Sequence, residues 1–231
     1  MTEKLSKIWE NHYPDNPMKM TPALLEYWDR VNALDAPRKE YSFDEARQLM
    51  YSGILAACPG FNFTPDVVTI LRNMLKWVYE LPCDLDTTKG ILLIGTPGTG
   101  KTTLMECLSN LTTYINRRPF KMCYTKEIAK QVERSKDLEH MVPFHRGSWC
   151  LDEMGHETGS TKIWGNTQNL FGDLLEYRYR RRHLITHGTT NIDMDKSDPK
   201  NLMTVYGERV YSRLHSIFNI VYLNGKDWRI G

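Results

Sequence analysis

Hydrophobic positions follow a helical period up to about residue 90 and then fall into short runs. Before residue 90, three helix start signals precede apolar residues at helical spacing: Thr21-Pro22, Ser42 with Glu45, and Thr64-Pro65-Asp66. The last signal leads into an apolar face over residues 67–78. The first part of the chain is therefore predicted to be helical, and residues 67–78 are predicted to pack against a core.

After residue 90, short apolar runs alternate with longer helical stretches. The runs cover residues 91–94, 120–124, 149–151, 184–186 and 217–223. Strands that alternate with helices are typical of an α/β fold in which crossover helices connect parallel strands. The pattern predicts a five-stranded, mainly parallel sheet flanked by helices over residues 61–231. Residues 1–60 are predicted to form a helical extension, a region suited to docking a partner.

Composition and charge narrow the classes of protein that fit this pattern. Hydrophobic residues make up 41% and charged residues 25% of the 231 positions, which excludes a wholly disordered or fibrous chain. Because the net charge is only +2, any nucleic-acid surface must be local. The N-terminus is charged throughout, and no apolar run reaches the roughly 20 residues of a membrane span. The five cysteines lack a C-x-x-C spacing. We therefore expect a cytoplasmic protein with reduced thiols and no membrane partner.

The first predicted strand leads directly into a glycine-rich loop that is followed by a helical pattern. The loop and the first helical residues are Gly95, Thr96, Pro97, Gly98, Thr99, Gly100, Lys101, Thr102 and Thr103. They match G-x-x-x-x-G-K-[ST], the phosphate-binding P-loop. Glycines allow backbone N–H groups to wrap around phosphate oxygens, and the helix N-terminus adds a favourable dipole. Lys101 is expected to reach the β- and γ-phosphates, Thr102 to bind Mg²⁺, and Thr103 to close the first helical turn.

A second, acidic motif indicates which nucleotide chemistry the loop serves. Asp152 and Glu153 follow the run at residues 149–151. An aspartate at the end of a core strand holds Mg²⁺, and the adjacent glutamate is placed to polarise an attacking water, which indicates hydrolysis. Residues 120–124 lie between the two motifs and are predicted to separate their strands, as in additional-strand ATPases. The sequence contains no N-K-x-D guanine-reading motif, so ATP is favoured over GTP.

Three further candidates follow the acidic motif. Asn191 lies just after the run at residues 184–186, where its side chain is expected to touch the γ-phosphate or the attacking water. Arg209 and Arg213 flank the apolar face of a helix predicted over residues 206–214. They are either ordinary surface charges or an arginine finger that enters the ATP site of a neighbouring subunit. Sequence order alone leaves both interpretations open.

Two basic segments are candidates for contact with nucleic acid. A helix predicted over residues 165–182 ends in Arg178 and the arginines at 180–182, which either stabilise the helix C-terminus or bind phosphates. Residues 117–124 combine Arg117, Arg118 and Lys121 with Phe120 and Tyr124, as stacking platforms for single-stranded DNA require. The same two rings also suit the core of a strand.

The motifs together resemble the AAA+ ATPases of the DnaC/IstB type, which include bacterial and phage helicase loaders. The resemblance rests on GTPGTGKTTL, CLDEMG, RYRRRHLITHGTTN, YGERVYSRL and FNIVYLNGKDWR, and it covers about residues 65–231. It implies ATP binding, side-by-side assembly with an arginine finger acting in trans, contact with single-stranded DNA, and delivery of the replicative helicase. The roles implied motif by motif are Walker A for Lys101 and Thr102, Walker B for Asp152 and Glu153, sensor 1 for Asn191, and the finger for Arg213 or, as second choice, Arg209.

The N-terminal region departs from this resemblance. It shows neither the cysteine and histidine spacing of the zinc module of some loaders nor a helicase-binding signature, so the helicase partner is implied by the resemblance alone. The family typically lacks a full helical lid, and no sensor 2 arginine is assigned. We predict an ATP-hydrolysing AAA+ protein of DNA replication, acting as a helicase loader. The alternatives are a transposition-helper ATPase of the IstB type, a P-loop kinase of small molecules, and an ATP-dependent assembly switch without hydrolysis.

Overall fold

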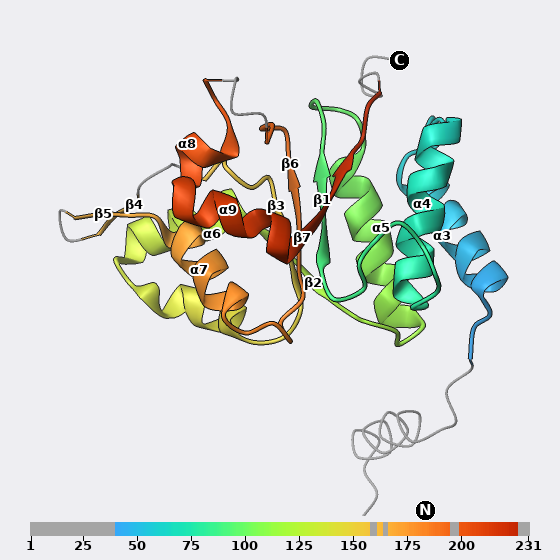
Figure 1. Ribbon diagram of the computed structural model, residues 1–231, viewed down its shortest axis with the longest axis horizontal. Helices are drawn as coiled ribbons and strands as arrows, with labels where there is room; N and C mark the ends of the chain where they lie inside the picture. Colours follow the sequence, from blue (N-terminus) through green and yellow to red (C-terminus); the bar gives the residue numbers. More distant parts are fainter. Residues whose placement is uncertain (1–39, 158–160, 164–165, 195–198, 226–231) are drawn as a thin grey trace, which may run out of the picture. The chain divides into compact units, whose positions relative to one another are not determined.

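The described residues, 40–157, 161–163, 166–194 and 199–225, form a parallel sheet covered by helices on both faces (Figure 1). The structure is a computed structural model. The strands of the sheet are β1 (Gly90–Ile94), β2 (Lys121–Tyr124), β3 (Trp149–Asp152), β6 (Thr186–Thr190) and β7 (Phe218–Tyr222). Their order is β2-β3-β6-β1-β7, and every neighbouring pair is parallel. The predicted five-stranded parallel sheet is therefore confirmed.

The strand that separates β1 from β3 in the sheet is β6. Residues 120–124, expected in that place, lie in and next to the edge strand β2 instead. Gly188 of β6 pairs with Leu92 of β1 on one side and with Leu151 of β3 on the other. Parallel strands need crossover connections, so strands that follow one another in the chain are not always neighbours in the sheet. As a result, the carboxyl ends of β1, β6 and β3 lie side by side.

Helices cover the two faces of the sheet separately (Figure 1). One face carries α3 (Phe43–Ala57), α4 (Pro65–Val78) and α5 (Lys101–Tyr114). The other carries α6 (Thr125–Ser135), the 3-10 helix η1 (Leu138–His145), α7 (Leu170–Tyr179), α8 (Leu202–Tyr206) and α9 (Glu208–Ile217). Each face has its own core, because successive side chains of a strand point to opposite faces. In β1, Ile91 and Leu93 pack with the first group of helices, and Leu92 and Ile94 pack with the second.

The capping signals predicted for α3 and α4 are present. Ser42 Oγ accepts a hydrogen bond from the Glu45 N–H (3.3 Å), and the Glu45 side chain completes the capping box. Thr64 Oγ1 accepts a hydrogen bond from the Val67 N–H (3.4 Å). The buried side chains of α3 share one core with α4 and α5. The compact unit therefore begins at Tyr41, so residues 41–60 belong to it and not to the separate extension expected over residues 1–60. The helix expected after Thr21-Pro22 lies outside the described residues.

Two helices differ from their expected ranges. Residues 166–168 belong to an antiparallel pair of short strands, β4 (Thr161–Ile163) and β5 (Asn166–Gln168), so α7 begins at residue 170 and not at 165. The Asn169 side chain accepts a hydrogen bond from the Gly172 N–H (3.0 Å) and caps this later start. The helix expected over residues 206–214 is interrupted at Gly207, whose φ of 84° separates α8 from α9. None of the described helices has both the length and the apolar character of a membrane span.

Candidate active site

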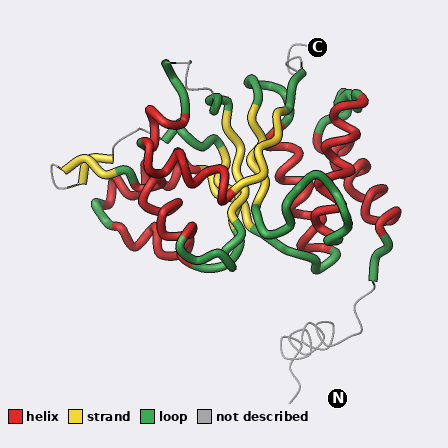
Figure 2. The backbone as a smooth tube through the Cα atoms, viewed as in Figure 1, coloured by secondary structure: helices red, strands yellow, loops and turns green. Residues whose placement is uncertain are grey.

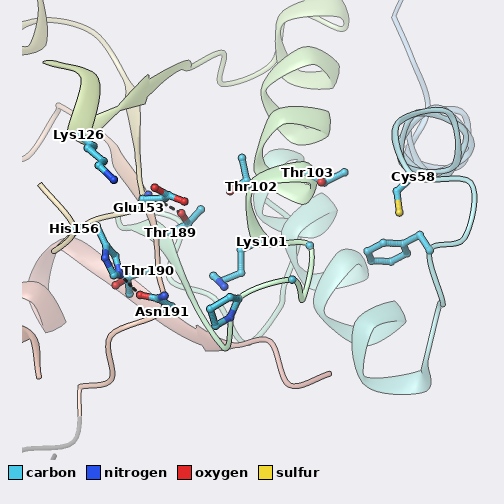
Figure 3. A pocket seen from close by; sticks show the side chains of 14 residues that line it. Cys58, Lys101, Thr102, Thr103, Lys126, Glu153, His156, Thr189, Thr190 and Asn191 are labelled. Atoms are coloured by element: carbon cyan, nitrogen blue, oxygen red, sulfur yellow. Dashed lines mark hydrogen bonds between the residues drawn. The ribbon is translucent and has the colours of Figure 1, made fainter. Parts of the chain in front are cut away.

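The loops that leave β1, β3 and β6 meet at one end of the sheet (Figures 1 and 2). A cavity of about 240 Å³ lies there, bounded also by the segment that joins α3 to α4. Its lining includes Pro97, Gly98, Gly100, Lys101, Thr102 and Thr103 of the predicted P-loop together with Glu153 and Asn191 (Figure 3). The carboxyl ends of parallel strands are where α/β proteins bind their ligands. The structure thus brings three separate sequence motifs together at such a position.

The loop between β1 and α5 has a backbone that requires glycine. Gly98 and Gly100 have φ values of 82° and 87°, in the left-handed region that favours this residue. A Cβ atom on Gly100 would lie 2.9 Å from the Phe61 ring, and one on Gly95 would lie 2.3 Å from the Leu223 carbonyl oxygen. No described side chain caps the start of α5, so the N–H groups of its first turn are available to an anion. The loop therefore fits a phosphate-binding role.

The side chain of Lys101 runs along this loop. Its ammonium group donates hydrogen bonds to the carbonyl oxygens of Gly95 (2.7 Å) and Thr96 (2.8 Å), and only 8% of the residue is exposed. Thr99 Oγ1 donates to the same Thr96 carbonyl oxygen (2.9 Å). Gly95, Thr96 and Thr99 thus shape the loop through its internal hydrogen bonds, and Lys101 supplies a positive charge to the cavity wall.

Asp152 is a buried carboxylate that connects the ends of β3 and β6 with the first turn of α5. It ends β3 and is 2% exposed. Its Oδ1 atom accepts hydrogen bonds from Thr102 Oγ1 of α5 (2.9 Å) and from Thr189 Oγ1 of β6 (2.6 Å). Burial raises the pKa of the Asp152 carboxyl, and the two hydroxyl donors oppose this rise because they stabilise the charged form.

The hydrogen-bonded oxygens of Thr102 and Asp152 have a separation that is also compatible with two neighbouring ligands of a magnesium ion. Mg²⁺ prefers an octahedron of oxygens at about 2.0–2.1 Å, in which neighbouring ligands are about 2.9 Å apart. Thr102 Oγ1 and Asp152 Oδ1 are separated by 2.9 Å. In the described part of the chain, no group of three or more His, Cys, Asp or Glu side chains could hold a metal on its own. The donor set therefore suits Mg²⁺ that takes its other ligands from water and phosphates.

Glu153 has a constrained backbone and an exposed side chain. Its φ of 57° lies in the left-handed region, which costs a non-glycine residue roughly 1–3 kcal/mol and is frequent at functional sites. Its N–H donates to Thr189 Oγ1 (3.0 Å), and its carbonyl oxygen accepts a hydrogen bond from Thr125 Oγ1 (3.2 Å). These contacts fix the point from which the carboxylate extends into the cavity (Figure 3). Asn191 lines the same cavity, and its Oδ1 atom contacts His156 Nε2.

The two candidate finger arginines lie away from this cavity. Arg213 Nη1 is 2.9 Å from one carboxylate oxygen of Glu176 on α7, and Arg209 Nε is 3.1 Å from the other. Neither arginine lines the cavity. The structure therefore does not bring them to the site of their own chain, and a role in a neighbouring subunit stays a prediction.

Three residues of the predicted basic segments are packed inside the protein. Arg178 is 1% exposed and donates four hydrogen bonds, to a threonine hydroxyl and three backbone carbonyl oxygens. Phe120 is 3% exposed, with its ring centroid 4.3 Å from that of His187. Arg118 is half-buried, 3.5 Å above the Trp77 ring. Packing and hydrogen bonds within the chain account for these three residues, whereas Arg117, Lys121, Tyr124 and residues 180–182 are exposed.

Six residues that were not predicted as site residues also line the cavity: Cys58, Phe61, Lys126, His156, Thr189 and Thr190. Thr189 lies two positions before Asn191 in the same polar strand end, a signal that could have identified it. Lys126 lies in the first turn of α6, and Phe61 lies between α3 and α4. They reach the cavity only because distant loops converge, which no local motif reveals.

Comparison with known proteins agrees with this fold. No protein-family model matches the chain, and no curated protein matches it either. The crystal structure of DnaI superposes with a TM-score of 0.58 and 22% identity, covering 76% of this chain and 92% of that one. The DnaC helicase loader superposes with a TM-score of 0.55 and 18% identity, covering 75% of this chain and 98% of that one. A DNA replication initiation factor superposes with a TM-score of 0.50 and 16% identity, covering 71% of this chain and 47% of that one. The chain therefore shares its fold with DnaI and with the DnaC helicase loader, as predicted.

Proposed function

We propose that this protein binds and hydrolyses ATP as an AAA+ ATPase of DNA replication, and that it acts in the cytoplasm as a helicase loader. The observation that carries the ATPase assignment is the hydrogen-bonded group of Thr102, Asp152 and Thr189. It joins the P-loop helix to the ends of two strands, in the cavity that Glu153 also lines. A glycine turn with an unrelated lysine would not require a buried carboxylate beside it.

Each group of cavity residues has a separate role in phosphoryl transfer to water. Loop N–H groups and Lys101 hold the phosphate chain, where their charge balances that of the phosphates. Thr102 and Asp152 would hold Mg²⁺, which neutralises charge on the β- and γ-phosphates when bound. Glu153 orients a water molecule and accepts its proton, and Asn191 positions the same water or the γ-phosphate.

In this proposal, a second copy of the chain supplies an arginine to the site. Arg213, or Arg209 beside it, enters the site of the neighbouring subunit and neutralises charge that develops in the transition state. Both side chains lie on α9 and share Glu176, so assembly must separate at least one of them from that carboxylate. Mixing Arg213→Ala with Lys101→Ala subunits tests this step. Recovery of turnover in the mixture supports an arginine acting in trans, and no recovery at any ratio contradicts it.

The assignment to replication rests on the fold shared with crystal structures described as the DnaC helicase loader and a DNA replication initiation factor. The partners that follow are a replicative helicase and single-stranded DNA. A transposition-helper ATPase would share the same core, so the test is capture of a purified replicative helicase against capture of a transposase. Capture of the transposase alone would overturn the loader assignment and leave the ATPase assignment intact.

Release of ADP from ATP tests the chemistry directly. Glu153→Gln keeps the size of the side chain but removes the base, and should lower turnover by about 10²–10⁴-fold. Nucleotide binding should stay close to that of the wild type. Glu139→Gln, at an exposed carboxylate of η1, is the matched control and should change neither quantity. Undiminished turnover in Glu153→Gln would contradict the hydrolytic assignment and favour a switch that only binds ATP.

A further inference from the structure

Positive charge gathers at the end of the sheet opposite to the cavity. Because all five strands are parallel, the segments that enter them lie together at this end, the lower edge of the sheet in Figure 1. Residues 80–89, 115–121, 145–149 and 180–185 enter β1, β2, β3 and β6, and they contain eight Lys or Arg and three Asp or Glu residues. The whole chain has a net charge of only +2, so this end is much more basic than the rest.

Most of these cations are not neutralised by a carboxylate. Three of the eight have carboxylate partners: Arg118 pairs with Glu80 and Lys89 with Asp86, each at 3.9 Å, and Arg180 pairs with Glu176 at 3.7 Å. Five others are exposed and have no ion-pair partner among the described residues: Arg117, Lys121, Arg146, Arg181 and Arg182. We refer to these five residues as the basic edge.

The entering segments form a continuous surface. The Arg118 guanidinium donates to the Thr87 carbonyl oxygen, which connects the entry to β2 with the entry to β1. A cavity of about 620 Å³, lined in part by Lys89, Arg182 and His183, lies between the entries to β1 and β6. With strands about 4.8 Å apart, the four entries span about 14 Å. That length suits a chain of several phosphates and exceeds what a single small anion needs.

Aromatic rings hold several of these cations in place. The Arg181 guanidinium carbon lies 3.7 Å from the Tyr177 ring centroid, and that of Arg117 lies 4.7 Å from the Tyr79 centroid. Lys121 Nζ is 5.8 Å from the Trp149 centroid. A cation that is already ordered by a ring loses less conformational entropy when it binds an anion. Cations interleaved with rings are also the usual composition of surfaces that bind single-stranded nucleic acid.

We propose that the basic edge binds the phosphates of single-stranded nucleic acid. This inference rests on the proposed function in its choice of ligand, and it adds the location of the contact. It places the nucleic acid at the end of the sheet opposite to the ATP cavity, so the two ligands do not compete for the same groups. Variants of the basic edge should therefore keep the basal ATPase rate.

Fluorescence anisotropy of the full chain with labelled oligothymidylate tests this location. The triple variant Arg146→Gln, Arg181→Gln, Arg182→Gln should bind about 100-fold more weakly at about 0.1 M salt, since each lost phosphate contact forfeits release of about 0.7 counterion. For the same reason, the slope of log affinity against log salt should flatten by about 2. Labelled oligouridylate distinguishes RNA from DNA, and binding of either strand through these residues supports the site.

The matched control removes three exposed cations elsewhere: Arg72→Gln, Lys130→Gln, Arg134→Gln. It should weaken binding less than threefold. An equal loss in both triple variants, no loss in the first one, or tighter binding of a duplex of mixed sequence would overturn the proposed site. Absence of nucleic-acid binding in a wild-type chain that hydrolyses ATP would also overturn the proposed site and would leave the ATPase assignment intact. That result is expected if the basic edge instead binds an acidic protein. Binding that follows the predicted pattern in a chain without turnover would support the site and contradict the ATPase assignment.

Discussion

Replacing Thr189 by valine tests the proposal that Asp152 is a ligand of Mg²⁺. The hydroxyl of Thr189 donates to Asp152 Oδ1 (2.6 Å) and accepts the Glu153 N–H (3.0 Å), and the residue is 1% exposed. Valine has nearly the same shape but no hydroxyl, so Thr189→Val removes both contacts with little change in packing. A hydrogen bond to a charged group contributes about 1.5–3 kcal/mol, and loss of a partner that orients a metal ligand lowers metal affinity by about 10–100-fold.

The assay is ATP turnover measured against Mg²⁺ concentration and against pH. We expect the Mg²⁺ concentration for half-maximal turnover to rise about 10–100-fold in Thr189→Val. The pH profile should move as well. Burial raises the pKa of Asp152 and the Thr189 hydroxyl lowers it, so loss of that hydroxyl raises the pKa further. Because the carboxylate must be charged to bind the metal, the acid limb of turnover should shift to higher pH.

Thr186→Val is the matched control for this experiment. Thr186 lies on the same strand, is also 1% exposed, and accepts a hydrogen bond from Arg178 Nε (2.7 Å) at the end of β6 away from the cavity. It should lose stability comparable to that lost by Thr189→Val while keeping the wild-type Mg²⁺ dependence. The reasoning is refuted if Thr189→Val leaves the Mg²⁺ dependence unchanged, or if Thr186→Val shifts it as far.

Three further predictions concern stability, each measured by urea unfolding. Gly100→Ala should lower the free energy of unfolding by about 1–3 kcal/mol, because the φ of 87° is strained for alanine and the new Cβ would lie 2.9 Å from the Phe61 ring. A decrease below about 0.5 kcal/mol would be inconsistent with this loop geometry. Arg178→Gln should lower the free energy of unfolding by about 3 kcal/mol or more, because the buried oxygens that accept hydrogen bonds from Arg178 are left unpaired. Arg180→Gln, at an exposed position, should change it by no more than about 0.5 kcal/mol. Equal effects of the two substitutions would count against a structural role for Arg178. Burial lowers the pKa of His187 from its usual 6.5 to about 3. As the pH falls, His187 therefore takes up a proton in the unfolded chain before it does so in the folded chain. The free energy of unfolding should decrease by about 1.4 kcal/mol between about pH 7.5 and 5.5. His187→Asn, which cannot be protonated, should lack this fall, and an identical pH profile in both proteins would contradict the assigned cause.

The sequence predicted the features of the fold that depend on local patterns. A continuous apolar run identified β1, and the cap at Thr64 identified α4, because each signal lies within or next to its own element. The position of β6 between β1 and β3 could not be read in the same way, since pairing between strands far apart in sequence leaves no local trace. The interruption at Gly207 was also missed, because a glycine within an amphipathic pattern is compatible with both a continuous and a broken helix.

The candidate site shows the same division. Lys101, Thr102 and Asp152 belong to motifs with fixed spacing, and the structure places them together in the cavity or at its wall. Thr189 has no such motif, and its importance follows from a hydrogen bond that spans 37 positions of the chain. Arg178 shows the opposite case, because a cation near a helix C-terminus looks exposed in the sequence but is buried by the loops that fold over it.

Calorimetric titration of the full chain with a slowly hydrolysed ATP analogue tests the ATP-binding assignment most directly. We expect one nucleotide per chain in the presence of Mg²⁺, weaker binding by the wild type without Mg²⁺, and loss of most of the affinity in Lys101→Ala. An absence of binding heat at several temperatures, or equal affinity in Lys101→Ala, would contradict the proposal that the loop between β1 and α5 holds the phosphates of ATP.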